Sequence, residues 1–331
     1  MRRIEPVVAL LGPVVLVAIV GVLAATASRA NEIYFLSAIV AVAMVASIYV
    51  FVGNSGVLSF GQISFVAVGA FAAGVLTVPG QSKSFVLPDL FPFLRDHTVG
   101  NIVSLGIAAV AGAILAALVG LPLMRLSGLA AGIATFAVLE VTHNLLREWT
   151  RIGPGATTLS LVPETTGALQ ATLGTIVVLT IVWLYGRSRP GRLLRATRED
   201  SAAAQAVGVG VHRQRLLAFT LSGALCGFAG GLYVHMLGSI TTEQVYLELT
   251  FLTLAMLVVG GLTSLWGAVV GALTISGLDS LLAKAEAGTF LWDAPSGTRL
   301  VVVGAVMALV LVLRPSGITG GRELTLPRRS S

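Results

Sequence analysis

The sequence predicts an all-α membrane protein that crosses the bilayer several times. Of its 331 residues, 56% are hydrophobic and only 11% are charged, whereas roughly a quarter of the residues of an ordinary soluble domain are charged. The hydrophobic residues are gathered in runs long enough to cross a hydrocarbon core as helices. This composition excludes a soluble enzyme, and it also excludes a disordered chain, which would need low hydrophobicity and high net charge.

Runs of about 20 apolar residues mark the expected spans in order along the chain. The first five lie near residues 7–27, 33–52, 57–78, 100–122 and 128–146. The second five lie near residues 169–185, 216–237, 247–262, 266–282 and 299–313. Glycines shorten or break the last few runs. We therefore expect about ten transmembrane helices, with eight as the alternative number.

Basic residues predict the orientation, because cytoplasmic loops carry an excess of Lys and Arg. The net charge of +6 comes from 21 Lys and Arg against 15 Asp and Glu, and the basic residues punctuate apolar runs rather than forming one cluster. If the N-terminus is inside, only seven fall on the outer side: Arg29, Lys83, Arg95, Arg147, Arg151, Lys284 and Arg299. We expect an even number of spans with both the N- and the C-terminus in the cytoplasm.

The first span has a signal peptide as its alternative, since Met1-Arg2-Arg3 precedes an apolar run and Ala25-Thr26-Ala27 resembles a cleavage site. The run from Val7 to Ala27 is longer than the 7 to 15 residues typical of a signal-peptide core. We therefore expect this helix to be retained.

The chain is expected to form a single transmembrane domain over residues 1–331. Its longest polar stretch, residues 187–215, is too short to build a core of its own and is predicted to be a cytoplasmic loop, with residues 314–331 as a cytoplasmic tail. No H-E-x-x-H or G-x-S-x-G motif occurs, and neither Lys83 nor Lys284 follows a glycine as a P-loop requires. The sequence thus predicts that this chain is not an enzyme and binds no cofactor or metal.

The polar stretch is predicted to contain a short amphipathic helix. Pro190-Gly191 breaks the chain, and residues 192–207 are expected to form one helix ending at Gly208. Three arginines share one face of this helix: Arg192, Arg195 and Arg198. Arg195 and Glu199 are spaced i,i+4 and could form an ion pair. The apolar surface for a partner comprises Leu194, Ala203, Ala204 and Val207. A docking helix for a cytoplasmic protein and a basic helix lying on anionic lipid are equally supported.

Glu140 is the main charged residue within the predicted spans. It lies in the outer half of the fifth span, one turn before His143 and Asn144, and a charge at mid-bilayer costs about 2.5 to 3.5 kcal/mol on insertion scales, so it should face protein or water. Two roles stay open: binding a substrate ammonium or a gating partner, or a structural link to His143 or to a backbone group on another helix. Asp279 could also line the path, but it is near an outer helix end, where extension toward water is favoured. A structural role is expected for the isolated His235.

A small polar group lies between two apolar spans and consists of Ser59, Gly61, Gln62 and Ser64. A broken helix at this point could present backbone N–H groups to a carboxylate. The alternative is close helix packing through small residues. We take this group, together with Glu140, as the candidate substrate pathway.

Five stretches in order along the chain carry a family resemblance. They are Leu58-Ser59-Phe60-Gly61-Gln62 with Gly69-Ala70; Gly128-Leu129 through Ile133-Ala134-Thr135 to Glu140; Gly191-Arg192-Leu193-Leu194-Arg195-Ala196-Thr197-Arg198-Glu199-Asp200 with Ala203, Ala204 and Gly208; Gly260-Gly261-Leu262-Thr263-Ser264-Leu265-Trp266-Gly267; and Arg314-Pro315-Ser316-Gly317-Ile318. Together they resemble the LivM-like permeases of branched-chain amino acid ABC transporters. The resemblance covers roughly residues 33–320, which makes it far more specific than any one motif.

The resemblance implies a permease subunit of an ATP-driven importer in the bacterial cell (inner) membrane. It implies four kinds of partner: a homologous second permease, two cytoplasmic ATPase subunits, an extracytoplasmic substrate-binding protein and the lipid bilayer. ATP would be used by the partner subunits, and no nucleic acid is expected to bind. The resemblance favours the docking helix over the lipid-bound helix, with these ATPase-coupling residues: Arg192, Arg195, Arg198, Glu199, Asp200, Ala203, Ala204 and Gly208.

The implied substrates are branched-chain or related small amino acids. Urea or short-chain amides are the alternative, because relatives of the same build carry them. A stand-alone secondary transporter would need paired charges within the membrane, and only Glu140 and Asp279 are available. Two positions depart from the family pattern: Ala202 stands where the docking motif has Glu, and Gln62 stands where the early motif usually has His.

Overall fold

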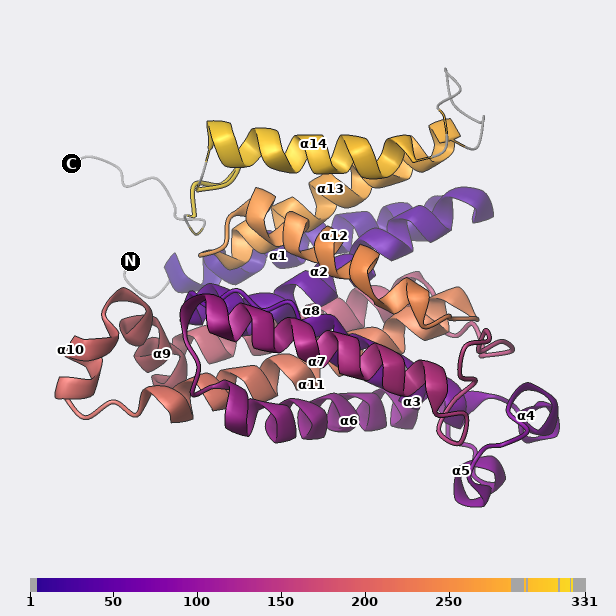
Figure 1. Ribbon diagram of the computed structural model, residues 1–331. Coiled ribbons are helices and arrows are strands. Elements are labelled where there is room, and N and C mark those ends of the chain that lie inside the picture. The colour runs from indigo at the N-terminus through magenta and orange to yellow at the C-terminus, as the bar shows by residue number, and fades with distance from the viewer. Residues whose placement is uncertain (1–4, 287–294, 296, 315, 322, 324–331) are drawn as a thin grey trace.

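The chain folds into a bundle of helices whose axes run in a common direction (Figure 1). The computed structural model describes residues 5–286, 295, 297–314, 316–321 and 323. Within these residues there is no β-strand, and one isolated bridge joins Leu159 to Ile240. Eight helices are long and apolar enough to cross a membrane. The prediction of an all-α polytopic membrane protein is confirmed.

Each of the ten expected spans coincides with a helix. These helices are α1 (Glu5–Thr26), α2 (Arg29–Ser55), α3 (Gln62–Thr77), α6 (Asn101–Leu123), α7 (Gly128–Glu148), α8 (Ala168–Arg187), α11 (Val211–Leu237), α12 (Leu247–Gly260), α13 (Leu265–Glu286) and α14 (Thr298–Leu313). Helix α12 alone has 14 residues, but with the short helix η1 (Glu243–Val245) before it the apolar stretch Glu243–Gly260 has 18 residues. The other two short helices, α3 and α14, have 16 residues each. At about 1.5 Å per residue they fall several Å short of a hydrocarbon core of about 30 Å. By length and composition, the described part of the chain therefore has eight candidate spans, the lower of the two expected numbers.

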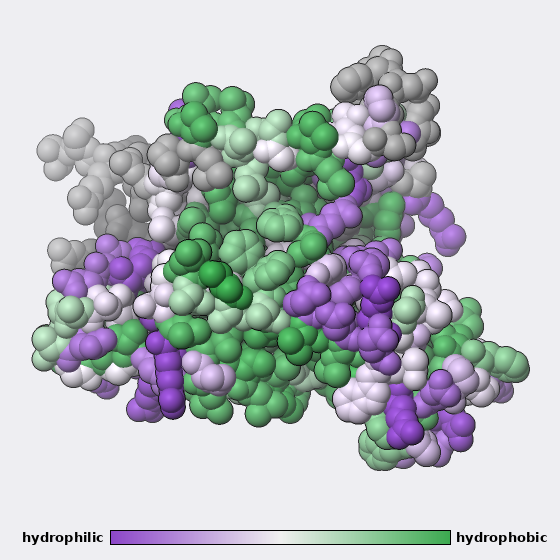
Figure 2. Space-filling view, viewed as in Figure 1, coloured by the Kyte–Doolittle hydropathy of each residue, from purple (hydrophilic) through white to green (hydrophobic). Residues whose placement is uncertain are grey.

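Short helices cover the two ends of the bundle (Figure 1). Helices α9 (Arg189–Glu199) and α10 (Ser201–Ala206) lie at the same end as the start of α1 and the end of α14. Helices α4 (Gly80–Val86) and α5 (Pro92–Asp96) lie at the opposite end. Figure 2 shows an apolar band across the middle of the bundle, with polar surface toward both ends. This arrangement suits a protein that spans a bilayer.

Parts of the termini lie outside the described residues. These parts include most of the predicted tail 314–331, the basic residues Arg2, Arg3, Arg322, Arg328 and Arg329, and Pro315 of the last family-like stretch. The cytoplasmic location of both termini stays a prediction.

The core forms around α11, which contacts α2, α3 and α6. A Cβ added to Gly69 of α3 would lie 2.2 Å from the carbonyl oxygen of Gly227 in α11. A Cβ added to Gly227 would in turn lie 2.2 Å from the carbonyl oxygen of Ala108 in α6. Both glycines are therefore needed for three helices to meet backbone to backbone, as small residues allow in membrane bundles.

The expected single helix over residues 192–207 is wrong, because the chain forms two helices there. Asp200 has an extended backbone, with φ −151°, and separates α9 from α10. Its Oδ1 accepts hydrogen bonds from the backbone N–H groups of Ala202 and Ala203, each at 2.9 Å. Aspartate is among the residues most favoured at this N-cap position. Since α11 already begins at Val211, the connection between spans is shorter than the predicted loop 187–215.

Candidate functional site

Two of the four arginines of α9, Arg195 and Arg198, point into the bundle, where they bind the ends of α2 and α8. Arg195 donates hydrogen bonds to Asn54 Oδ1 at 3.0 Å and to the carbonyl of Gly186 at 2.6 Å. Arg198 donates to the carbonyl of Gly53 at 2.8 Å. The last carbonyls of a helix lack partners within that helix, and arginine satisfies them here. The two arginines thus hold α9 against the ends of α2 and α8.

The expected ion pair between Arg195 and Glu199 is wrong. Glu199 accepts instead from Arg198, its chain neighbour, at 2.7 Å, while Arg195 is turned toward α2. Arg192 is exposed and donates to the carbonyl of Arg187 at 2.7 Å. The three arginines therefore do not present one free basic face.

The exposed surface of this segment is a patch of small apolar residues on α10. Ala202, Ala203 and Ala206 are exposed, and the side chain of Val207 is 79% accessible. Leu194 and Ala204, which we expected to offer surface to a partner, are buried inside this chain. The segment turns back toward α11 at Gly208, which has φ +85°, a conformation that favours glycine. We call Ala202, Ala203, Ala206 and Val207 the α10 patch.

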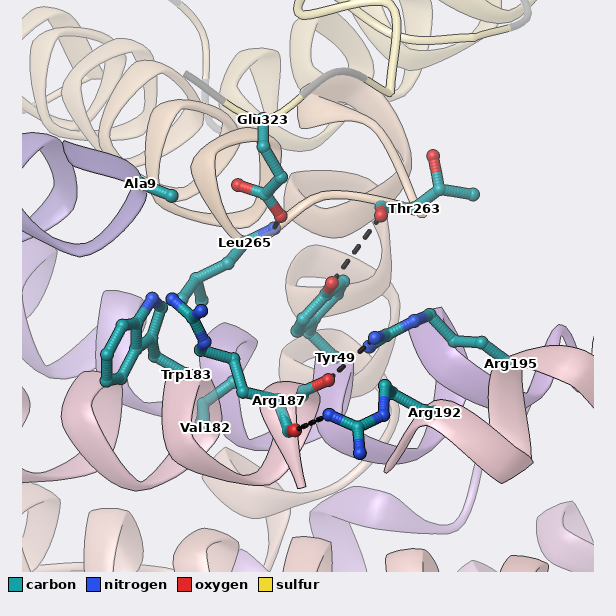
Figure 3. A pocket seen from close by; sticks show the side chains of 11 residues that line it. Ala9, Tyr49, Val182, Trp183, Arg187, Arg192, Arg195, Thr263, Leu265 and Glu323 are labelled. Carbon is teal, nitrogen blue, oxygen red and sulfur yellow. Dashed lines mark hydrogen bonds between the residues drawn. The ribbon is translucent and has the colours of Figure 1, made fainter. Parts of the chain in front are cut away.

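A cavity of about 500 Å³ lies behind α9 and is lined by residues of α2, α8, α9 and the segment before α13. Figure 3 shows Arg187, Arg192 and Arg195 on one side of it and Glu323 on the other. Glu323 accepts hydrogen bonds from the backbone N–H groups of Leu265 at 2.7 Å and Trp266 at 3.4 Å, and thereby caps the start of α13. Burial raises the pKa of the Glu323 carboxyl, while these two N–H groups oppose the rise.

The polar group at the start of α3 is buried, and the helix is broken there as predicted. Helix α2 ends at Ser55 and α3 begins at Gln62. Gln62 Oε1 lies 3.0 Å from Ser222 Oγ of α11. Gly61 lies against α7, where an added Cβ would be 2.5 Å from the carbonyl oxygen of Thr135. Gln62 Nε2 and the hydroxyls of Ser59 and Ser64 have no hydrogen-bond partner among the described residues.

Glu140 lies on the outward face of α7, where it links α7 to the start of α12. Its carboxylate accepts hydrogen bonds from Asn144 Nδ2 at 2.8 Å and from the hydroxyl of Tyr246. The ring of His143 stacks on Tyr246 with 3.8 Å between centroids, and His143 Nε2 lies 3.5 Å from Glu243 Oε1. Neither of the two structural partners that we expected, His143 or a backbone group of another helix, receives the link, which runs to the side chain of Tyr246.

A narrow gap between α3 and α7 contains Ser64 of the predicted pathway residues but not Glu140. It is lined by Ser64 of α3, by Thr142 and His143 of α7, and by Thr242 before the short helix η1 (Glu243–Val245). Ser64 Oγ and His143 Nδ1 are both buried there and lack partners in the described part of the chain. Sequence reasoning missed Thr242, Glu243 and Tyr246; the only available signal was that polar residues interrupt the apolar pattern just before α12.

His235 and Asp279, the other two titratable residues considered within the spans, have defined partners. His235 is fully buried and lies within hydrogen-bond distance of Ser104 Oγ, 3.0 Å, and of the carbonyl of Pro163, 3.1 Å, which confirms its structural role. Asp279 does not simply extend toward water, because its Oδ1 lies 3.1 Å from Arg299 Nε. No group of three or more His, Cys, Asp or Glu side chains that could hold a metal ion occurs within the described ranges.

Comparison with known proteins assigns the family. The family model described as branched-chain amino acid transport system / permease component matches residues 29–311. The high-affinity branched-chain amino acid transport system permease protein LivM of Escherichia coli is 25% identical, over 81% of this chain and 65% of LivM. The probable branched-chain amino acid transport permease protein LivH of Methanocaldococcus jannaschii is 33% identical, over 44% of this chain and 46% of LivH.

A third relative has a different name. The autoinducer 2 import system permease protein LsrC of Klebsiella pneumoniae is 28% identical over 55% of this chain and 54% of LsrC. The chain thus spans less than two thirds of the length of each of these three relatives. No solved structure matches the chain significantly. On the family match and its eight long apolar helices, the chain belongs to the permease components of branched-chain amino acid transport systems and is a multi-pass protein of the inner membrane.

Proposed function

We propose that the chain is the permease subunit of an ATP-driven importer for branched-chain or related small amino acids. It would pair with a homologous second permease, with two cytoplasmic ATPase subunits and with an extracytoplasmic substrate-binding protein. ATP hydrolysis would take place on the partner subunits, because this chain carries no P-loop. The relatives LivM and LivH, which are named for branched-chain amino acid transport, support this substrate class.

The observation that carries the proposal is the α10 patch. It is apolar, exposed and lies at one end of the bundle, beyond the apolar band (Figures 1 and 2). Small apolar side chains on a short helix suit burial against a protein partner. A basic helix lying on lipid would present its arginines together, whereas Arg195 and Arg198 are turned inward and only Arg189 and Arg192 of α9 are exposed.

The contacts of α9 provide a route from this patch to the membrane-embedded residues. Arg198 bonds to Gly53, and an added Cβ at Gly56 would lie 2.7 Å from Arg198 Cγ. A displacement of α10 and α9 would therefore shift the end of α2 and the segment 56–61 that leads into α3. That segment carries Ser59 and Gly61, and the hydroxyl of Thr135 in α7 accepts from the N–H of Phe60 at 3.2 Å. In this way motion of an ATPase would reach the proposed pathway.

Replacing Ala203 by Asp tests the docking surface. A carboxylate in the centre of a buried apolar contact is left unpaired, which typically costs several kcal/mol. We expect the variant to be inserted normally and to lose most of the co-purifying ATPase and most ATP-dependent leucine uptake. Thr98→Asp, an exposed position at the opposite end of the bundle, is the matched control and should retain both.

Uptake of several radiolabelled compounds separates the candidate substrates. A strain that lacks this chain should regain leucine, isoleucine or valine uptake when the chain is restored. Restoration of urea or acetamide uptake alone would assign the alternative substrate class, and restoration of autoinducer 2 uptake alone would assign the substrate named for LsrC. Leucine uptake into vesicles that contain only this chain and no ATP would contradict the importer.

A further inference from the structure

A second cavity, of about 390 Å³, lies between α2, α11, α12, α13 and α14. Its size is within the range of small-molecule sites. Glu248 lies in the first turn of α12 and Arg299 in the first turn of α14, so both lie at the end of the bundle opposite α9 and α10. Met44 and Met256 line the cavity from positions nearer the middle of α2 and α12. The cavity therefore extends from the α4/α5 end toward the middle of the helix bundle.

The charged end of this cavity combines one guanidinium with two carboxylates. Arg299 Nε lies 3.1 Å from Asp279 Oδ1, and Arg299 Nη2 forms an ion pair with Glu248. The Arg299 backbone N–H is also held, by Glu286 Oε1 at 2.7 Å. The side chains of Asp279, Arg299 and Glu248 are 23%, 32% and 51% accessible. The charges are therefore fixed in place but can still be reached by a ligand.

Such a network is matched to a ligand that carries both charges. A ligand carboxylate can take the place of Glu248 or Asp279 on Arg299, and the freed side-chain carboxylate can accept an ammonium. Every charge then keeps a partner, whereas a ligand with only one charge would leave one group uncompensated at the edge of a low-dielectric cavity. The phenol of Tyr233 and the amide of Gln244 also line this end.

The inner part of the cavity is mainly aliphatic and adaptable. Besides the two methionines, Ala41 and Leu252 line it, together with Ser276 and Thr253, whose hydroxyl donates to the carbonyl of Leu249. Methionine is flexible and fills irregular space around aliphatic groups of different shape. A branched aliphatic side chain could be buried here while its α-carbon substituents remain among the charges.

We propose that this cavity is the site at which the chain receives its substrate, and that it binds a zwitterionic α-amino acid with an aliphatic side chain. Arg299 would bind the ligand carboxylate, and Glu248 and Asp279 would bind its ammonium. The proposal rests on the proposed import function and adds a binding site within this chain to it. The site differs from the predicted pathway residues of α3 and α7, none of which lines this cavity.

Cysteine protection in the purified chain tests the site directly. The native Cys226 is fully buried, so a membrane-permeant thiol reagent should label mainly an introduced cysteine. Ser37→Cys places a thiol at the wall of the cavity, and Ser280→Cys places one beside a different cavity, between α2 and α13. We expect millimolar L-leucine to slow labelling of Ser37→Cys at least fivefold and to leave Ser280→Cys unchanged.

Two analogues of leucine test whether both charges are recognised. Isoamylamine keeps the ammonium and the branched chain, and 4-methylpentanoate keeps the carboxylate and the branched chain. We expect neither to protect Ser37→Cys at the concentration at which leucine does. Equal protection by either analogue, or protection of both cysteines by leucine, would overturn the proposal.

Transport by substituted chains separates this site from the proposed function. In a strain where the wild-type chain restores leucine uptake, Arg299→Gln should raise KM at least tenfold, and Arg299→Lys should raise it less because the charge is kept. Membrane levels are measured by immunoblot, and Asp96→Asn serves as a control outside the cavity. An unchanged KM in Arg299→Gln would refute the site while the import function stood. Failure of the wild-type chain to restore leucine uptake would refute the import function itself, whatever the labelling result.

Discussion

The two ends of the bundle use arginine in different ways. At the α9 end, Arg195 and Arg198 bind backbone carbonyls and an amide, through Gly186, Gly53 and Asn54. At the opposite end, Arg299 binds the carboxylates of Asp279 and Glu248. A backbone carbonyl at a helix end is a fixed hydrogen-bond acceptor of the folded chain. A side-chain carboxylate that is paired with arginine can be replaced there by the carboxylate of a ligand. The α9 arginines therefore hold helices together, and Arg299 is available for exchange.

Because of this difference, we expect substitutions at the two ends to affect different properties, stability at one end and transport at the other. Substitutions at the α9 end are expected to act on the folded bundle and on the position of α10. Substitutions among the charged residues near the α4/α5 end are expected to act on transport with less effect on folding. The same contrast holds for the carboxylates, since Glu323 caps a helix while Glu140 bonds to the side chains of Asn144 and Tyr246.

The largest expected effect on stability follows from Arg195→Met. The substitution keeps the apolar stem and removes charged hydrogen bonds to Asn54 and Gly186, each worth about 1.5 to 3 kcal/mol in other proteins. Because Arg195 is partly exposed, we expect a loss of about 2 kcal/mol, measured as a lower unfolding temperature in detergent. Arg189→Met, at an exposed arginine of the same helix, should change it little. Equal effects of the two would show that Arg195 is not an anchor.

Glu140→Gln tests whether the contact between α7 and the start of α12 is needed for transport. The amide keeps the shape of the side chain but removes the charge that accepts from Tyr246 and Asn144. Because weaker hydrogen bonds loosen the contact between α7 and the start of α12, we expect leucine uptake to fall roughly tenfold and the unfolding temperature to fall slightly. Tyr246→Phe should have a smaller effect of the same sign. Normal uptake and normal ATPase coupling in Glu140→Gln would leave this residue with a structural role only.

Asp200→Ala tests how α10 is stabilised at the α9 end. It removes the cap of α10, and loss of an N-cap typically costs about 1 kcal/mol. We expect faster hydrogen exchange in residues 201–206 and weaker ATPase co-purification, with exchange in α9 unaffected. Asp200→Ser, which can still cap, is the control. Unchanged exchange would mean that the α10 patch is held by other contacts.

The smallest effect is the pH dependence that Glu323 contributes. Burial raises its pKa above the ordinary 4.5 in the folded chain, so its favourable contribution is present at lower pH and is lost as the pH rises through the folded value. Relative to Glu323→Gln, the wild-type chain should therefore lose stability as the pH increases from about 4 toward neutrality. Unfolding temperatures of both proteins across this range measure the difference. A difference independent of pH would contradict the buried position of the carboxylate.

Much of the fold was predictable because it follows from local composition. All ten apolar runs became helices, since an apolar segment in a bilayer must satisfy its backbone hydrogen bonds internally. The break before Gln62 was predictable from the glycines and serines near it. The break at Asp200 was also encoded locally, as a capping residue, but the periodicity of Arg192, Arg195 and Arg198 suggested a longer helix.

The candidate sites were only partly predictable. Glu140 was identified because placing a charged side chain within the membrane is energetically unfavourable. Its partner Tyr246 is 106 residues away in sequence and was not identified. Arg299 was counted only as an outer basic residue, and its pairing with Asp279 and Glu248 depends on three helices packing side by side. Sequence spacing identifies neighbours on one helix and carries no information about contacts between helices that are far apart in the chain.

The sequence by itself determined that this protein lies in a membrane, how many apolar helices it has and to which family it is similar, because hydrophobicity and motif order are properties of single segments. Only the tertiary structure decided which polar groups face inward and which remain available. Arg195 and Arg198 are used internally while Ala203 and Val207 are exposed. The physical reason is that a buried charge requires a partner within reach, and packing alone decides which residues are within reach.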